Sequence, residues 1–399
     1  MQSMKVLIAN VGSTSFKFKL YDMPSEKVIA SGKIERVGQP KSPMQYKGNG
    51  EVTQEIACPD QKTSIQTVLK LLTDPKLGVL KDVTELGAVG LKTVHARGIN
   101  DCVRINRDVL ARMEEYTPLC PAHNPPYVLA SRLFLELLPD KPIVGVFEPH
   151  FHKTIPDYAY TYGIPQTWAD KYSIRRYGFH GASHRHVSER VPQLLGVSPV
   201  GLRIISCHLG GSSSVCAIKD GKSIDTSMGF SAQSGLDNAQ RCGDIDPFLI
   251  PFVMDKEKLT TDDVRKALCK NGGLAGISGV PSGDFRDLED AAKQGNARAK
   301  LAIDVFAYNL IKYIGAYAAV LNGVDAIAFA GGIGENRSEF RDTVCAAFGY
   351  LAVELDAEKN KVRGEEMIIS SLCSKVKVVV VKTNEELVVA RETVRVAAT

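Results

Sequence analysis

Hydrophobic and polar positions alternate near the start of the chain, with one interruption. Along residues 7–22 an apolar run ends at Asn10, and the alternation resumes with Phe16, Phe18 and Leu20. Alternation with a period of two residues is typical of a half-buried strand. The pattern therefore predicts a β-hairpin whose turn, Asn-Val-Gly-Ser-Thr-Ser, is rich in hydroxyl groups and backbone N–H donors.

A second segment repeats this pattern. Residues 202–225 contain an apolar strand, the turn His-Leu-Gly-Gly-Ser-Ser-Ser and another apolar strand, which suggests two halves of similar construction. Backbone N–H groups in Gly/Ser turns form anion-binding concavities. Either turn alone is better explained as a tight hairpin, but a third glycine-rich strand end at 330–336 favours nucleotide binding.

The remaining pattern alternates strands with helices. Residues 326–334 form an apolar strand that runs into glycines, and residues 375–396 form a strand, a short turn and a helix that opens on Asn384 and Glu385. Residues 297–321 have the spacing of one long, largely buried helix. This alternation predicts an α/β fold.

Composition narrows the class of protein. The 399 residues are enough for two domains, and the net charge of +4 gives no nucleic-acid footprint. The nine cysteines are scattered and lack a CxxC pair, which favours a reducing cytoplasm over disulfides or a zinc site. No apolar run approaches the ~18 residues of a membrane span, no signal peptide is evident, and we interpret Met1-Gln2-Ser3 as a short leader.

Several longer motifs resemble, in their order along the chain, those of a known protein family. In chain order these are "NVGSTSFKFKLYD", "HNPP", "YGFHGASH", "SCHLGGSSSVCAI", "DTSMGF", "RCGDIDP", "GISGVPSGDFRDL", "GGIGEN" and "TNEEL". Together they resemble the acetate kinase family, within the superfamily that includes actin, nearly end to end. The resemblance implies two duplicated actin-like (ribonuclease H-like) domains, 1–150 joined by a C-terminal helix at about 385–399, and 151–384. It also implies a nucleotide cleft between them, ATP with Mg²⁺ or Mn²⁺, a homodimer, and reversible phosphoryl transfer to a short carboxylate.

Two residues match the family's phosphoryl-contacting groups. Arg241 corresponds to the arginine that stabilises charge in the transition state, where its planar fork can bind two oxygens. The alternative is a surface ion pair with Asp244 or Asp246. His180 corresponds to the histidine that contacts the transferring phosphoryl group; an isolated histidine in a Gly-rich turn would more simply be structural.

Other matches concern the metal and the nucleotide. Glu385 corresponds to the Mg²⁺ carboxylate with Asn10 near the same ion, although a carboxylate at a helix start is also favoured by the helix dipole. The resemblance implies that Lys17 reaches the phosphates, the alternative being a solvent-facing strand lysine. The other residues implied to bind ATP are His208, Leu209, Gly210, Gly211, Ser212, Asp284, Phe285, Arg286, Gly332, Ile333, Gly334, Glu335 and Asn336.

The chain departs from the family pattern where the carboxylate is expected. The substrate-binding arginine is replaced by Lys92, with Arg97 as a possible substitute, and the catalytic aspartate is replaced by Glu148. A lysine is a point charge where the arginine is a bidentate fork. Since both changed residues would border the carboxylate, we expect them to have changed together.

The predicted acyl pocket differs as well. Val94 and Phe179 are kept, whereas Ala122 stands where the family has leucine and Ala232 where it has proline. Two large-to-small changes would enlarge the pocket. We therefore expect a kinase for acetate or propionate, with two alternatives: a kinase for a larger or more polar acid, and a nucleotide-binding relative that has lost catalysis.

Overall fold

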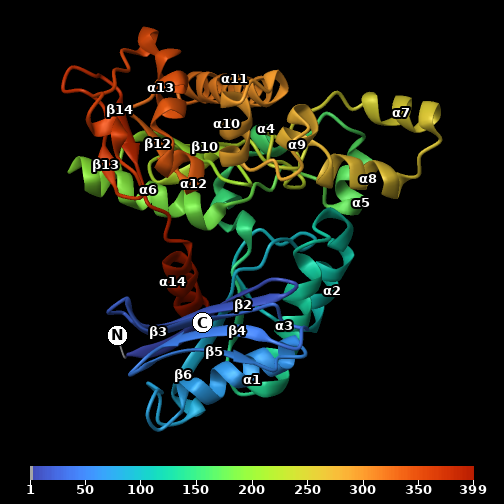
Figure 1. Ribbon diagram of the computed structural model, residues 1–399, viewed down its shortest axis with the longest axis vertical. Helices are drawn as coiled ribbons and strands as arrows, with labels where there is room; N and C mark the ends of the chain where they lie inside the picture. The colour runs from blue at the N-terminus through green and yellow to red at the C-terminus, as the bar shows by residue number, and fades with distance from the viewer. Residues whose placement is uncertain (1–2) are drawn as a thin grey trace. The chain divides into compact units, whose positions relative to one another are not determined.

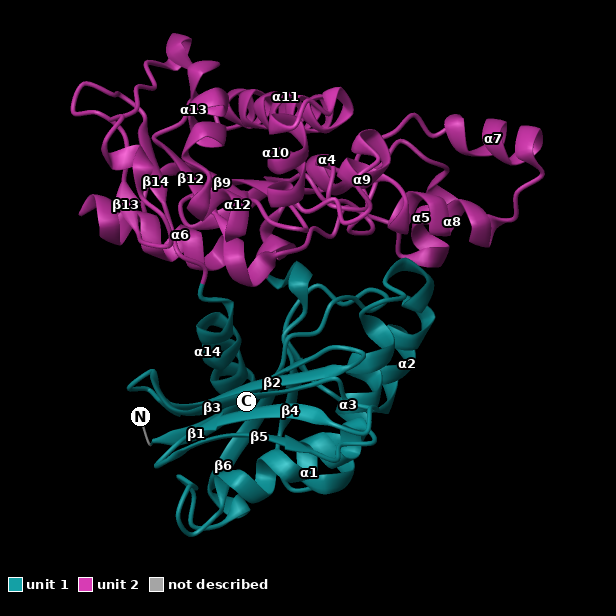
Figure 2. Ribbon diagram, viewed as in Figure 1, with its two compact units in different colours: residues 1–150, 384–399 teal, residues 151–383 magenta. Residues whose placement is uncertain are grey.

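The computed structural model describes residues 3–399; Met1 and Gln2, the start of the predicted leader, lie outside the described residues. The chain forms two compact units (Figure 1, Figure 2). Unit 1 contains residues 1–150 and 384–399, and unit 2 contains residues 151–383.

Unit 1 is built on an eight-stranded sheet of order β5-β4-β3-β2-β1-β6-β8-β7. Strands β1 to β5 are joined by antiparallel pairing, whereas β1, β6 and β8 run parallel to one another. The predicted hairpin is present, with Val11 opposite Phe16, and its turn is shorter than expected. The strands are β1 (Met4–Val11), β2 (Ser15–Met23), β3 (Lys27–Glu35), β4 (Ser42–Lys47), β5 (Glu51–Ile56), β6 (Leu86–Leu91), β7 (Val103–Arg104) and β8 (Ile143–Gly145).

Helices cover both faces of this sheet. The helices are α1 (Gln61–Leu72), α2 (Arg107–Glu115), α3 (Asn124–Leu137) and α14 (Glu385–Ala397). Along β1, Leu7 and Ala9 join the core under α1 and α3, while Val6 and Ile8 join the smaller core under α14. Alternate side chains of β1 therefore pack into a hydrophobic core on each face of the sheet.

Unit 2 is built on a six-stranded sheet of order β11-β10-β9-β12-β14-β13. Strands β11, β10 and β9 pair antiparallel, whereas β9, β12 and β14 run parallel. The strands are β9 (Arg203–His208), β10 (Ser214–Lys219), β11 (Lys222–Thr226), β12 (Ala326–Ala330), β13 (Met367–Ile368) and β14 (Lys377–Val380).

The helices of unit 2 again lie on both faces of its sheet. Helix α6 packs over the face that carries Ile204 and Cys216, and the long α11 packs over the face that carries Ile205 and Val215. The helices are α4 (Asp157–Tyr160), α5 (Gln166–Tyr172), α6 (Gly181–Leu195), α7 (Leu249–Glu257), α8 (Thr261–Lys270), α9 (Gly273–Ser278), α10 (Phe285–Lys293), α11 (Ala297–Val320), α12 (Gly331–Asn336) and α13 (Ser338–Ala346).

The two sheets share one plan. The order β3-β2-β1-β6-β8 in unit 1 corresponds to β11-β10-β9-β12-β14 in unit 2, with the same senses of pairing. Each unit adds a short antiparallel edge strand at the end, β7 or β13. This confirms the predicted α/β class with two similarly built halves. Among the helices of residues 3–399, none is long and apolar enough to cross a membrane.

Candidate active site

In unit 1, the predicted site residues lie where three neighbouring parallel strands end. Asn10 is near the end of β1, Lys92 directly follows β6, and Glu148 follows β8 by three residues. Because β1, β6 and β8 are adjacent and parallel, their carboxyl ends meet at one edge of the sheet. Ligands of α/β sheets bind outside this edge.

A three-residue ionic cluster occupies this edge. The ammonium of Lys92 is 3.0 Å from Glu148 Oε1 and also donates a hydrogen bond to Glu385 Oε2. The Lys92 side chain is 21% exposed and that of Glu148 is 8% exposed, so the charges interact with little water around them. Burial opposes charge on the amine, but the two carboxylates outweigh it and hold the pKa of Lys92 above its usual value.

The two departures from the family pattern are therefore in direct contact. The lysine replaces an arginine and the glutamate replaces an aspartate, and the pair meets at an ion-pair distance. Arg97, the possible substitute for the arginine, instead pairs with Glu115 on α2 at 3.0 Å. Lys92 is thus the cation at the end of β6.

Tyr127, which was not among the predicted site residues, contacts one of them. Its hydroxyl donates a 3.0 Å hydrogen bond to Asn10 Oδ1, and burial raises its pKa to about 12, so the phenol stays protonated. The signal was present, because Tyr127 directly follows the "HNPP" motif in α3. Lys17 lies directly opposite Asn10 in the β1–β2 ladder, where it is exposed.

The donor groups at this edge fit a hard divalent cation. Asn10 offers an amide oxygen, and Glu385 and Glu148 offer carboxylate oxygens, which are the ligand types of Mg²⁺. A cationic group, the Lys92 ammonium, already binds both carboxylates. Glu385 is also the first residue of α14, where the helix dipole favours a carboxylate.

In unit 2, His180 belongs to a hydrogen-bonded chain beneath α6. His180 Nδ1 lies 2.8 Å from Ser214 Oγ, and the same hydroxyl lies 2.8 Å from His184 Nε2. The chain continues from His184 Nδ1 to Ser206 Oγ at 2.9 Å. Burial, followed by neighbouring His152 and His208, lowers the pKa of His184 well below its usual value, so His184 is neutral.

The periodicities of β9, β10 and α6 explain why these histidines and serines lie together. Ser206 and His208 are two residues apart on β9, and Ser214 pairs with His208 across the ladder, so all three share one face. His180 and His184 are four residues apart at the start of α6, which covers that face. His184 lies in the "YGFHGASH" motif, but neither it nor Ser206 or Ser214 was predicted as a site residue.

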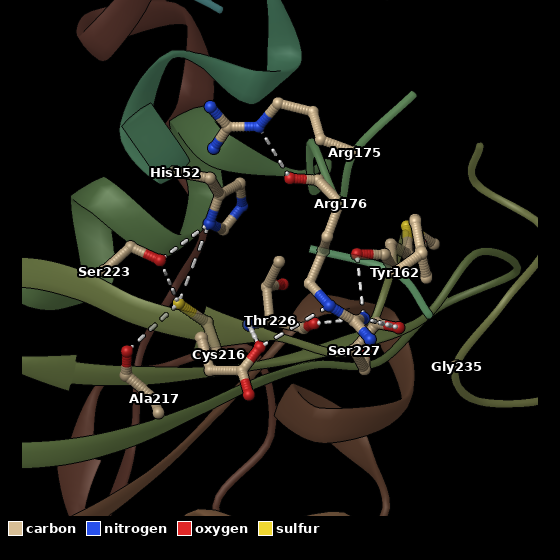
Figure 3. Close-up of polar contacts among 12 residues, drawn as sticks. His152, Tyr162, Arg175, Arg176, Cys216, Ala217, Ser223, Thr226, Ser227 and Gly235 are labelled. Atoms are coloured by element: carbon tan, nitrogen blue, oxygen red, sulfur yellow. Dashed lines mark hydrogen bonds and ion pairs between the residues drawn. The ribbon is translucent and has the colours of Figure 1, made fainter. Parts of the chain in front are cut away.

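His152 fixes the backbone just before His180. Its Nε2 lies 2.9 Å from the Phe179 carbonyl, and its Nδ1 lies 2.8 Å from Ser223 Oγ. Figure 3 shows His152 directed toward Ser223 and Cys216, and Arg176 directed toward the carbonyls of Thr226 and Ser227. His180 itself has φ +55°, a conformation that such anchoring stabilises.

Arg241 is held by neutral oxygens. Its Nη2 donates to Ser212 Oγ and, at 3.2 Å, to Asn238 Oδ1. Asp244, proposed above as its alternative partner, accepts hydrogen bonds from the Gly235 N–H and the Tyr313 hydroxyl. The contacts with Ser212 and Asn238 orient the guanidinium.

Two glycine-rich segments of unit 2 pack against each other. The N–H of Leu209 donates to the Ala330 carbonyl at 2.8 Å, and the N–H of Ile333 donates to the Leu209 carbonyl at 2.9 Å. Gly331 has φ +76°, and a Cβ there would lie 2.6 Å from the Leu209 oxygen, so a larger residue would push the segments apart. Both segments lie at the carboxyl ends of β9 and β12, as the unit 1 residues do in their own sheet.

The other predicted nucleotide residues have varied surroundings. The Glu335 carboxylate accepts from the N–H groups of Gly331 and Thr383, so it braces the protein's own backbone. Asp284 caps α10 and forms a two-point ion pair with Arg286, which lowers the pKa of Asp284 to about 2. Phe285 is buried against Phe340.

The predicted acyl-pocket residues are divided between the two units. Val94 is half-buried and Ala122 is exposed in unit 1, while Phe179 is buried and Ala232 is half-buried in unit 2. Their contribution to a common pocket stays a prediction.

The residues at the two sheet edges are of the kinds that phosphoryl transfer uses. Unit 1 supplies a cation and oxygen ligands, and unit 2 supplies Gly/Ser turns, an oriented arginine and a histidine chain. Comparisons with known proteins agree. A family model described as the acetokinase family matches residues 5–391.

Relatives and solved structures match over nearly the whole chain. The acetate kinase of Clostridium botulinum is 46% identical over 392 residues, covering 98% of each chain, and that of Desulfitobacterium hafniense is 47% identical over 395 residues, also covering 98% of each. The crystal structure of Porphyromonas gingivalis acetate kinase (40% identity, TM-score 0.87) covers 98% of this chain and 99% of its own. That of a Francisella tularensis propionate kinase (32% identity, TM-score 0.88) has the same coverage. The chain belongs to the acetokinase family, and it is a phosphotransferase that uses ATP and a carboxylate acceptor.

Proposed function

We propose that this protein reversibly transfers the γ-phosphoryl group of ATP to acetate or a similarly short carboxylate, giving an acyl phosphate and ADP. A carboxylate oxygen forms the new bond to phosphorus while the bond from phosphorus to the ADP oxygen breaks. The nucleophile is already ionised at neutral pH, so no general base is needed. The site must instead hold several negative groups together, and its residues are suited to that task.

The observation that carries this proposal is the Lys92 cluster at the edge of unit 1. Lys92 is the cation expected to bind the acceptor carboxylate, and Glu148 orients its ammonium at 3.0 Å. On unit 2, Arg241 donates hydrogen bonds to Ser212 and Asn238, which orient its guanidinium and suit it to charge developing on the phosphoryl oxygens. His180, oriented through Ser214, would donate a hydrogen bond to the same group.

The proposed reaction also needs a divalent ion. Asn10 and Glu385 would hold Mg²⁺ (or Mn²⁺), with Tyr127 fixing the Asn10 amide. When bound, the ion neutralises charge on the phosphate oxygens of ATP.

A panel of acceptors tests the function. The full chain is incubated with ATP, Mg²⁺ and hydroxylamine, and acyl hydroxamate is measured for straight-chain acids from C2 to C6. We expect acetate or propionate to react, with Arg241→Ala as the inactive control. Reaction only with longer acids would replace the proposed substrate, and no reaction with any acid while ATP binds would indicate a relative that has lost catalysis.

A second candidate is a kinase for a larger acid. The small side chains of Ala122 and Ala232 favour it, and so does the likeness to a propionate kinase structure. Because one methylene changes the specificity of an apolar pocket by only about 1–3 kcal/mol, the preference would be graded.

We also propose a homodimer in the cytoplasm. On α7 and the residue before it, Phe248 is 79% exposed and Phe252 is 61% exposed, an apolar surface typical of subunit contacts. Light scattering of the parent and of Phe248→Ser/Phe252→Ser tests the dimer, which the double variant should weaken. All nine cysteines are free thiols, which suits a reducing compartment.

A further inference from the structure

Lys92 occupies a position that raises an electrostatic difficulty for the proposed function. Its ammonium already lies between two carboxylates, Glu148 and Glu385, which carry more negative charge than it can balance. A third carboxylate, that of the acceptor, would add to this excess. Binding of the acceptor by Lys92 therefore requires that its ammonium leave one of these two carboxylates.

One of the two carboxylates is also the predicted metal ligand. Glu385 begins α14 and is bound by Lys92, so a divalent ion on this carboxylate would meet the ammonium at close range. Two cations at one carboxylate repel each other in surroundings with little water. Metal and ammonium must compete for Glu385.

We propose that Lys92 is an exchangeable internal cation. Without metal it occupies the divalent ion's place between Glu148 and Glu385, and metal binding releases its ammonium to the acceptor carboxylate. This inference rests on the proposed function, since it assigns the metal to Glu385 and the acceptor to Lys92. It makes Lys92 a substrate-binding residue that couples the two binding events.

The side chain is suited to such an exchange. A lysine ammonium is a compact charge on a flexible stem with three donors, so it can change partners by rotating a few bonds. The arginine of the family pattern presents a rigid planar fork, which binds one arrangement of oxygens and gives it up less readily. After the exchange, the N-terminus of α14 still favours the charge on Glu385.

Linkage gives the proposal a measurable consequence. If metal releases Lys92 to the acceptor, then acetate must tighten metal binding by the same factor as metal tightens acetate binding. Replacing Lys92 with a neutral residue should remove the competition and the coupling together.

Mn²⁺ binding by electron paramagnetic resonance tests this on the full chain without nucleotide. We expect Lys92→Met to bind Mn²⁺ at least about tenfold more tightly than the parent, because a like charge has been removed from contact. Saturating acetate should tighten Mn²⁺ binding by the parent severalfold and leave Lys92→Met unchanged. Glu385→Gln should lose this Mn²⁺ site, which identifies the signal.

A matched control is available on β2, next to the same helix. Lys19 pairs with Glu386, the neighbour of Glu385, at 3.7 Å and is not part of the site. Lys19→Met makes the same charge change, and its Mn²⁺ affinity should stay within about twofold of the parent.

The outcomes separate this inference from the proposed function. Equal Mn²⁺ affinity of Lys92→Met and the parent, or of Lys92→Met and Lys19→Met, overturns the exchange. If Lys92→Met does not fold, the parent protein still tests the exchange. Mn²⁺ binding by the parent that does not tighten with acetate also overturns the exchange. Hydroxamate formation by the same parent preparation reports on the function independently.

Discussion

Arg341 gives the sharpest test of how the nucleotide segment is supported. This residue of α13 is fully buried, and its guanidinium donates only to oxygens of neutral groups in the contacts observed. Nη1 binds the Gly334 carbonyl and Nε binds Asn360 Oδ1, each at 2.8 Å, while Nη2 binds the Asn360 and Val362 carbonyls. Through Gly334 the arginine fixes α12, the glycine-rich segment predicted to bind adenosine.

The cost of removing this side chain follows from those contacts. Arg341→Met has a similar length but leaves four acceptor oxygens without their donor, and each hydrogen bond to a charged group is worth about 1.5–3 kcal/mol. Part of this loss is recovered, because burial disfavours the charge and lowers the pKa of Arg341 to about 10. We therefore expect a net loss of about 3–5 kcal/mol in the free energy of unfolding, because these buried oxygens are left without a donor.

Urea unfolding of the full chain measures this loss. Trp168 is the one tryptophan of the sequence and belongs to unit 2 with Arg341, so its fluorescence follows the relevant unit. Arg298→Met is the matched control, because Arg298 also donates to two carbonyls, at 2.8 and 3.1 Å, but is exposed. Water can replace those bonds, so the control should lose less than about 1 kcal/mol.

ATP binding provides the second measurement. Under conditions where Arg341→Met is folded, its ATP affinity should fall, because the Gly334 carbonyl no longer has its anchor. The reasoning is refuted if Arg341→Met is destabilised no more than Arg298→Met.

Three further predictions concern the site. Arg241→Ala should abolish phosphoryl transfer while ATP binding persists, since its charge acts in the transition state; equal losses of turnover and ATP affinity, measured by calorimetry, would contradict this. Glu385→Ala should raise the Mg²⁺ concentration that gives half-maximal rate, because the metal loses a protein carboxylate; an unaltered Mg²⁺ profile would show that Glu385 does not hold the metal. Ala122→Leu combined with Ala232→Pro should move kcat/KM toward acetate and away from butyrate, by a factor of about ten for each pocket methylene lost. A parent enzyme that already prefers acetate to both propionate and butyrate would remove the case for an enlarged pocket.

Much of the fold is encoded in local pattern. Period-two alternation located the hairpin of β1 and β2, and apolar spacing located α11, which ends one residue before its predicted end. These features are readable because neighbours along the chain decide them: a strand turns successive side chains to opposite faces, and a long helix buries one stripe. The motifs also located the glycine-rich ends of β9 and β12, where short side chains are a local requirement.

Only the tertiary structure decided which charges and polar groups meet. Lys92 and Glu385 are 293 residues apart in the sequence, yet they form one ion pair because α14 packs against the sheet of unit 1. The histidine–serine chain beneath α6 and the carbonyls around Arg341 likewise join separate segments. No local sequence pattern predicts such partners, because water could satisfy the hydrogen bonds and charge of each side chain equally well. They are specified by burial, which removes the water and leaves the protein's own groups as the available partners.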